Sequence, residues 1–400
     1  MLGFGLAFSL LCAETPARAQ VNVRLLLVSG SAVPGHPGFR FGAFQKLAMN
    51  GKQQVVFLSS LRSPAANLKA VVRSQGVSFS VVAFTGLVSP VSGEQYESFS
   101  APSINDAGAV AFGAALKTES ESLPTAAIVR VTGGNTDLVA ANGNAGAASF
   151  GSVFKAFSAP VIGSGGEVLF AARTSGADPH SGLYLWASAG IHPVPLPKGF
   201  RLGPRDLLEP LFASHDEAVF VRQGVDMAAA REQFFRAIAT RNFQQLNPAP
   251  NPSGTVQVLP ARSGQKPVQM LLVLLHGDHA DTAVLEGDPT QPVVAKIAPE
   301  AGAAKGSTFS AIEGQAAGRR SGSVIFAGVS SGPLGNFGLF CFCDGQVQRL
   351  TTPADFGLLL GNLNGKTISS FAGDGQGTVA LIAPVGTEPD GNAIFVCDTP

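Results

Sequence analysis

The sequence predicts an all-β protein, a seven-bladed β-propeller of four-stranded blades, closed by an N-terminal strand that completes the last blade. Three observations lead to this prediction. The composition is rich in glycine and poor in charge. A unit of about 54 residues recurs along the chain. The segments at the two ends of the chain add up to the length of one unit, which completes the count of seven.

The composition favours many turns over solvated helix faces. Charged residues make up 14% of the chain, against roughly 25% in an average soluble protein, and 48 of the 400 residues are glycine. A hydrophobic fraction of 45% is ample for a core, so the composition excludes a disordered chain. The formal net charge is zero and no lysine and arginine stripe is present, so we expect no nucleic acid partner.

Residues 1–19 are expected to be a signal peptide, followed by a single domain at residues 20–400. An apolar run precedes Ala17-Arg18-Ala19, which has the small-x-small pattern that signal peptidase cleaves. Cys12 follows Leu11 rather than a small residue, which disfavours a lipoprotein. No later segment reaches the ~18–20 apolar residues of a membrane span. We therefore expect a secreted or periplasmic monomer without a membrane span.

The clearest copy of the repeat is SINDAGAVAF at residues 103–112, which is typical of a strand end, a four-residue turn and an alternating strand. Its last residue, Phe112, has counterparts at spacings of 50–58 residues along the chain. The counterparts are Phe57, Phe170, Phe220, Val273, Phe326 and Leu381. Seven copies therefore account for the mature chain.

Each copy is predicted to contain four short strands. In the third copy these are residues 157–162, 167–173, 183–187 and 191–196. In the second strand of the second copy, large Val110 and Phe112 alternate with small Ala109, Ala111 and Gly113. This alternation suits sheets stacked face to face, because a phenylalanine of one sheet needs a small residue opposite it.

The ends of the chain predict how the ring closes. After Leu381 there is room for a third strand at residues 392–397 but not for a fourth. Residues 21–29 resemble the fourth strand of the other copies and exceed what the first copy needs. We therefore expect residues 21–29 to pair beside residues 392–397 and to complete the last blade.

Residues 226–246 leave two alternatives open. The segment MAAAREQFFRAIATRNF could form an amphipathic helix. The register of the repeat instead favours a strand at residues 234–240, preceded by one helical turn at most.

The motif Asn105-x-x-Gly108-x-x-Ala111-Phe112 resembles that of bacterial exported proteins with tandem NxxGxxAF repeats, which carry a choice of C-terminal anchors. The resemblance implies an exported repeat protein and no particular activity. Only the second copy matches in full. Asn50 is a partial match, and the residues that replace the asparagine elsewhere are Gly163, Ser214, Arg262 and Gly373. Asparagine and glycine at these positions are also common in turns of unrelated proteins.

The densest group of potential metal ligands follows a predicted strand at residues 268–275 and consists of His276, Asp278, His279 and Asp281. Two histidines and two aspartates could bind a divalent metal. The same residue types are equally ordinary in a solvated loop. We expect no cofactor and keep a divalent metal as the alternative.

The candidate ligand contacts are Asp178, His180, Asp278, His279 and Asp390, all in predicted connections between second and third strands. These connections should share one face of the disc with the connections between blades. They are longer and more varied than the turns of the other face. Because binding residues usually lie on loops held by a rigid scaffold, we expect a protein or surface ligand to contact this face. The alternative is that these residues are polar because loops are polar.

Cys341, Cys343 and Cys397 remain after signal removal, an odd number for an oxidising compartment. Cys341 and Cys343 lie two apart on one predicted strand, at the edge of disulfide geometry. Cys343 and Cys397 occupy equivalent third-strand positions in adjacent blades, so a bridge between these two is the other possible pairing. We expect buried free thiols instead.

No motif for catalysis is visible: the chain has no G-x-S-x-G elbow, no H-E-x-x-H helix and no Walker loop. Trp186, Tyr96 and Tyr184 are the only Trp and Tyr residues, which disfavours a sugar-binding platform. Our first hypothesis is a non-enzymatic exported scaffold that binds a protein or surface ligand. The alternative is a hydrolase or lyase with a site at the mouth of the channel, with or without a metal.

Overall fold

The structure is a computed structural model of the chain. It describes, with side chains, residues 21–117, 125–144, 152–176, 181–187, 190–194, 325–328, 338–341, 349–351, 355–356, 368–374, 376–386 and 391–399. Between residues 207 and 349 it also describes the backbone of the strands given below. The predicted signal peptide lies outside the described residues.

The named elements are all strands, and the first four sheets follow the chain in order. The first sheet contains β2 (Arg40–Met49), β3 (Val55–Arg62), β4 (Asn67–Gln75) and β5 (Ser78–Phe84). The second sheet contains β6 (Gln95–Phe99), β7 (Ser103–Ile104), β8 (Val110–Lys117), β9 (Thr125–Thr132) and β10 (Asn135–Ala141). The third sheet contains β11 (Val153–Phe157), β12 (Val161–Ile162), β13 (Val168–Ser175), β14 (Ser181–Ala187) and β15 (Gly190–Val194). The fourth sheet contains β16 (Leu207–Ser214), β17 (Glu217–Gln223), β18 (Gln233–Ile238) and β19 (Asn242–Leu246).

Two two-stranded sheets come next, β20 (Val256–Val258) with β21 (Met270–Leu272) and β22 (Thr282–Glu286) with β23 (Val293–Ile297). The penultimate sheet contains β24 (Thr308–Ala317), β25 (Val324–Ser331), β26 (Phe337–Cys343) and β27 (Gln346–Arg349). The terminal sheet contains β28 (Ser370–Gly373), β29 (Thr378–Pro384), β30 (Asn392–Asp398) and β1 (Asn22–Val28). The predicted all-β fold of antiparallel four-stranded sheets is therefore confirmed.

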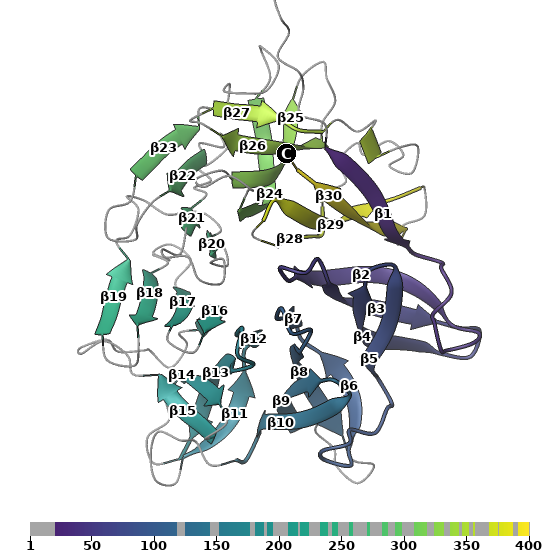
Figure 1. Cartoon of the computed structure of the whole chain (residues 1–400). Helices are drawn as coiled ribbons and strands as arrows, with labels where there is room; N and C mark the ends of the chain where they lie inside the picture. Colours follow the sequence, from purple (N-terminus) through teal and green to yellow (C-terminus); the bar gives the residue numbers. More distant parts are fainter. Residues whose placement is uncertain are drawn as a thin grey trace, which may run out of the picture.

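The sheets follow one another around a common centre, from the purple first sheet through teal to the yellow terminal sheet beside it (Figure 1). The two ends of the chain meet in the terminal sheet, where β1 pairs antiparallel with β30 from Asn22 opposite Asp398 to Val28 opposite Ala393. The predicted pairing of residues 21–29 with residues 392–397 is confirmed. A strand from each end of the chain thus belongs to one sheet.

The repeated turn has the same backbone hydrogen bond in four sheets. In the second sheet, the Asn105 N–H donates to the Ala109 carbonyl, and Gly108 takes a φ of 78° that side chains rarely adopt. The corresponding first donors in the other sheets are Asn50, Gly163 and Asp374. Asp374, not Gly373 as the sequence indicated, therefore occupies the asparagine position of the last copy.

The predicted first strand at residues 157–162 is divided, which is a correction to the sequence reading. The structure has β11 and β12, because Pro160 has no N–H to give to a ladder and Ser158 takes over the pairing. Ser158 donates its N–H to the Ala171 carbonyl and accepts the Ala171 N–H with Oγ. The second sheet repeats this at Ser100, which bonds Gly113 in the same two ways.

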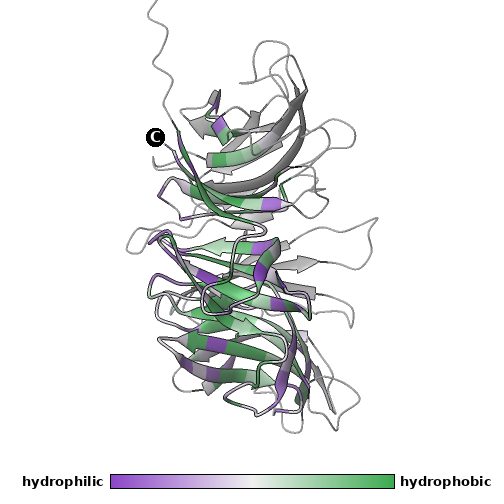
Figure 2. Ribbon diagram, turned by 90° about the vertical axis from the view of Figure 1, so that its right-hand side faces the viewer, coloured by the Kyte–Doolittle hydropathy of each residue, from purple (hydrophilic) through white to green (hydrophobic). Residues whose placement is uncertain are grey.

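The hydrophobic core lies between neighbouring sheets rather than in one central cluster, and hydrophobic residues concentrate in the strands (Figure 2). Val110 and Phe112 of β8 pack toward the first sheet with Val56. Ala109, which immediately precedes β8, and Ala111 on the other face of β8 pack with phenylalanines of the third sheet. The predicted division into a large and a small face is confirmed.

The alternatives at residues 226–246 are also settled where the structure describes them. Residues 233–238 form β18 and residues 242–246 form β19, so the strand prediction is confirmed and no helix occupies these positions.

Candidate functional site

The predicted ligand residues lie outside the described residues, and the structure gives only their place in the chain. Asp178 and His180 fall between β13 and β14, and Asp390 falls between β29 and β30. The group at residues 276–281 falls between β21 and β22. The strands β13 and β29 each begin at a repeated turn and end at one of these connections. The grouping of these side chains remains a prediction.

Within the described residues, recurring polar contacts are found at the repeated turns. The asparagine of one turn bonds the turn of the next sheet. Asn50 Nδ2 donates to the Asn105 carbonyl at 2.7 Å, and Asn105 Nδ2 donates to the Gly163 carbonyl at 2.9 Å. The Oδ1 atoms of the two asparagines accept the N–H groups of Gln54 and Ala109 within their own turns. Both asparagines are buried. Each side chain therefore closes its own turn and links it to the next one.

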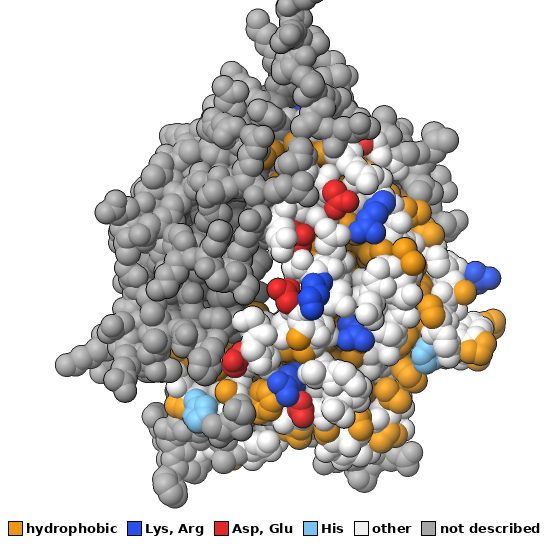
Figure 3. Space-filling view, in the orientation of Figure 1, with side chains coloured by type: hydrophobic (Ala, Val, Ile, Leu, Met, Phe, Trp, Pro, Cys, Tyr) orange, Lys and Arg blue, Asp and Glu red, His pale blue; other side chains and the backbone are white. Residues whose placement is uncertain are grey.

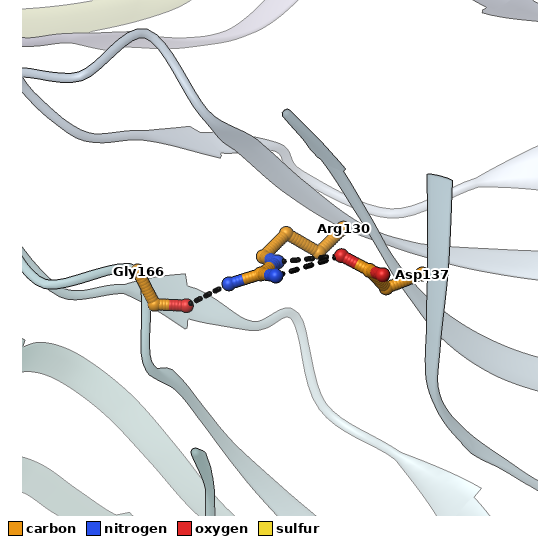
Figure 4. Close-up of polar contacts among 3 residues, drawn as sticks. All are labelled: Arg130, Asp137 and Gly166. Carbon is orange, nitrogen blue, oxygen red and sulfur yellow. Dashed lines mark hydrogen bonds and ion pairs between the residues drawn. The ribbon is translucent and has the colours of Figure 1, made fainter. Parts of the chain in front are cut away.

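An arginine makes a second link at the same two junctions. Arg73 on β4 donates from Nη1 to the Gly108 carbonyl at 2.8 Å, and Arg130 on β9 donates to the Gly166 carbonyl at the same distance. Arg130 is held in place by Asp137 Oδ2, 2.7 Å from Nη2 (Figure 4). It also stacks on Trp186, with Cζ 4.3 Å from the ring centroid.

The junction between the terminal and first sheets is linked by different residues. Asn392 of β30 accepts the Phe44 N–H with Oδ1 and donates Nδ2 to the Phe44 carbonyl, at 3.1 Å and 3.2 Å. Ser370 Oγ accepts the Leu47 N–H at 2.8 Å. The pairing of β2 with β3 shifts register beside Phe44 and Leu47, so side chains of the neighbouring sheet bond these backbone groups.

The turns of three sheets also contact one another. The Gly51 N–H donates to Asp106 of the second sheet at 2.7 Å, and the Gly51 carbonyl accepts from Gln376 of the terminal sheet at 3.4 Å. Acidic and basic side chains are interspersed over the described part of this face (Figure 3). These hydrogen bonds link three sheets. Because charges of both signs are interspersed, this part of the face carries no strong positive or negative electrostatic potential.

Burial raises the pKa of three ionisable side chains in the described core. Burial raises the pKa of the Cys397 thiol, and the negative charge of Asp398 raises it further. Burial likewise raises the pKa of Tyr96 and Tyr184. These are packing residues rather than groups prepared for proton transfer.

The cysteines correct part of the sequence reading. Cys397 is a free, buried thiol, as expected, so a bridge between Cys343 and Cys397 is wrong. Cys341 is disulfide-bonded, which contradicts the expectation of a free thiol there.

The described part of the chain lacks two kinds of feature. Within it, no three or more His, Cys, Asp or Glu residues are grouped as metal ligands would be. The same part holds no helix with the length and apolar character of a membrane span.

Comparison with protein families gives a match over the first part of the chain. A family model described as "Family of unknown function (DUF7453)" matches residues 14–194. No curated protein matches the chain.

Solved structures similar to the chain are β-propellers. The β-propeller domain of the Trilobed protease from Pyrococcus furiosus has 11% identity and a TM-score of 0.53, with 90% of this chain and 93% of that chain covered. The Pyrococcus horikoshii acylaminoacyl peptidase has 12% identity and a TM-score of 0.51, and prolyl oligopeptidase B from Galerina marginata has 9% and 0.52. The match covers 90% and 89% of this chain but only 51% and 49% of those two enzymes. At these identities the similarity shows a β-propeller fold alone.

Sequence reasoning missed the links between sheets. The asparagine was read as turn chemistry, although its recurrence at Asn50 and Asn105 was visible. A second signal was also present: Phe-Ser-Ala-Pro occurs at residues 99–102 and again at 157–160. The serines of the second signal bond Gly113 and Ala171 within their own sheets, so only the asparagine marks a link between sheets.

Proposed function

We propose that the chain is an exported, closed seven-bladed β-propeller that binds a protein or surface ligand as a non-enzymatic scaffold. Each sheet of four or five strands is one blade, and the two two-stranded sheets β20–β21 and β22–β23 together form the fifth blade. The pairing of β1 with β30 supports closure, because it joins the two ends of the chain in the seventh blade. The signal peptide predicted at residues 1–19 supports export.

The observation that carries the binding hypothesis is the use of the polar turn groups. At the repeated turns, Asn50, Asn105 and the Gly108 and Gly166 carbonyls are occupied by bonds between blades. The recurring polar groups of this face therefore form hydrogen bonds between blades and are not free to bind a ligand. The connections at the opposite ends of the second strands contain Asp178, His180, Asp278, His279 and Asp390, and we assign ligand contact to that face.

Two sets of variants test the assignment. One set changes the long-connection residues (Asp178→Ala with His180→Ala, and Asp278→Ala with His279→Ala). The control changes exposed Lys52→Ala on the repeated-turn face. Partners of the parent are captured from extract of the source organism and their contact sites located by cross-linking mass spectrometry. Cross-links at the long connections and loss of capture in the first set are expected. Loss of capture in the control alone would overturn the assignment.

The alternative is a hydrolase or lyase with a site at the channel mouth, and the residues at 276–281 are its strongest support. Elemental analysis of the purified protein separates the two functions. Stoichiometric Ca²⁺ or Zn²⁺ that is lost in a His276→Ala, His279→Ala variant would favour the enzyme. The scaffold predicts no stoichiometric metal.

A further inference from the structure

The repeated turn of the first sheet contains a residue in an unusual backbone conformation. This residue is Gln53, whose N–H donates to the Asn50 carbonyl at 3.0 Å and whose φ is 60°. Side chains rarely adopt this left-handed conformation, because the Cβ atom then lies too close to a backbone oxygen. The equivalent residues of the other three described turns are glycines, Gly108, Gly166 and Gly377. The first turn therefore carries steric strain that the glycines avoid.

The side chain of Gln53 bonds the terminal sheet with both polar atoms of its amide. Nε2 donates to Oγ1 of Thr378, the first residue of β29, at 2.8 Å. Oε1 accepts from Nη2 of Arg24 on β1 at 3.4 Å. A glycine at this position could form neither bond. Strain at a residue whose side chain bonds a neighbouring sheet indicates that the turn keeps the strain because of that side chain.

The Gln53 amide is part of a chain of hydrogen bonds between a cation and an anion. Arg24 donates to the amide, and the amide donates to the Thr378 hydroxyl. The hydroxyl donates to Oδ1 of Asp398 on β30 at 3.0 Å. The guanidinium also fixes which way the amide points, because Nε2 beside it would place two donors together. Thr378 is buried, and hydrogen bonds in such a chain strengthen one another.

These contacts lie beside the hydrophobic core that the first and terminal sheets share. Met49 of β2 is buried in that core and immediately precedes the turn. Ala380, two residues after Thr378, belongs to the same cluster. Separating the two sheets at this end exposes Met49 and breaks the bond between Gln53 and Thr378.

We propose that Gln53 is a lock on the junction between the terminal and first sheets, because its strained backbone directs an amide that holds the two sheets together. The bond to Thr378 contributes most, since it is short and partly buried, whereas the bond to Arg24 is long and exposed. Asn392 and Ser370 bond the same two sheets through β2. Gln53 adds a bond at the end of the junction beside the turn. The inference needs neither a ring of seven blades nor a ligand.

Oxidation of Met49 by hydrogen peroxide, followed by mass spectrometry of the full mature chain, measures how often this junction opens. Gln53 is exposed, so its variants should fold. Gln53→Ala removes the amide and keeps the strained conformation, and should speed oxidation of Met49 about fivefold. Gln53→Gly removes the strain as well, and should therefore unfold at a higher urea concentration than Gln53→Ala.

Two controls separate the lock from a general loss of stability. Asn105→Ala removes an amide that bonds a different pair of sheets, and should change the rate of Met49 oxidation by less than about twofold. In a Thr378→Val background, which lacks the partner hydroxyl, Gln53→Ala should likewise change the rate by less than about twofold. A parental rate of Met49 oxidation in Gln53→Ala, or an equal acceleration in Asn105→Ala, would overturn the proposal.

Discussion

Two junctions between neighbouring sheets are linked by hydrogen bonds from different residues. One lies between the first and second sheets, and the other lies between the terminal and first sheets. At the first, a turn asparagine and an arginine donate to the neighbouring turn. At the second, Asn392 and Ser370 bond backbone groups where β2 shifts register. Only the first solution depends on the repeat. A repeat motif can therefore encode contact between copies, while the place where the chain's ends meet needs residues of its own.

The largest expected effect comes from removing β1. Deleting residues 21–29 removes the strand that pairs with β30 and exposes the edge of the terminal sheet. Buried Leu27 and the partly buried Val23 and Val28 are lost with it. We expect the free energy of unfolding to fall by about 4 kcal/mol or more, measured by urea denaturation of the mature chain. A deletion variant that melts like the parent would show that β1 does not hold the ring.

Asn392 is expected to have the next largest effect. Asn392→Ala removes both hydrogen bonds to Phe44 and leaves the backbone N–H and carbonyl of Phe44 without them. A loss of about 2 kcal/mol in unfolding free energy is expected. Asn67→Ala, at an exposed position, is the matched control and should change stability by less than about 0.5 kcal/mol. Similar losses in the two variants would mean that the link contributes nothing.

Arg73 should matter less, because its single bond to Gly108 is only partly buried. Arg73→Met keeps most of the aliphatic contact and removes the donor, and should cost about 1 kcal/mol. Lys69→Met on the same strand controls for the loss of positive charge. If the two changes cost the same, the arginine acts by charge alone.

The smallest effect is a dependence on alkaline pH. Because the pKa of Cys397 is raised in the folded protein, its contribution is complete below the unfolded thiol pKa of about 8.5 and is lost as pH rises above it. Unfolding free energy should decline between about pH 8 and pH 9.5, before tyrosines ionise. Cys397→Ala should lower stability at pH 7 and remove this slope. An unchanged slope would assign the decline to another group.

Much of the fold could be predicted because its signals are local. The alternation at Ala109–Phe112 specifies which face of β8 meets which neighbour, and the spare segment at residues 21–29 specifies its partner. The division of the first strand was missed although Pro160 signals it, because the serine that replaces the ladder acts through a bond to β13. Assigning Gly373 rather than Asp374 to the last turn was a one-residue error of register.

The candidate site was predictable only as residue types in connections. Asp178, His180 and Asp390 are separated by long stretches of chain, and no spacing rule states which of them meet in space. The links at Asn50 and Asn105 were hidden for a related reason. A turn asparagine looks the same in the sequence whether its amide faces water or the next sheet.

The central claim is that the repeated asparagine links neighbouring sheets through its amide, and exchanging amide and carboxylate tests it most directly. Asn105→Asp keeps the Oδ1 that accepts the Ala109 N–H and removes the donor to Gly163, whereas Asp374→Asn makes the opposite change at the one described turn that already works with a carboxylate. Urea unfolding should show a loss of about 2 kcal/mol for Asn105→Asp and a change below about 1 kcal/mol for Asp374→Asn. An Asn105→Asp variant as stable as the parent would contradict the account.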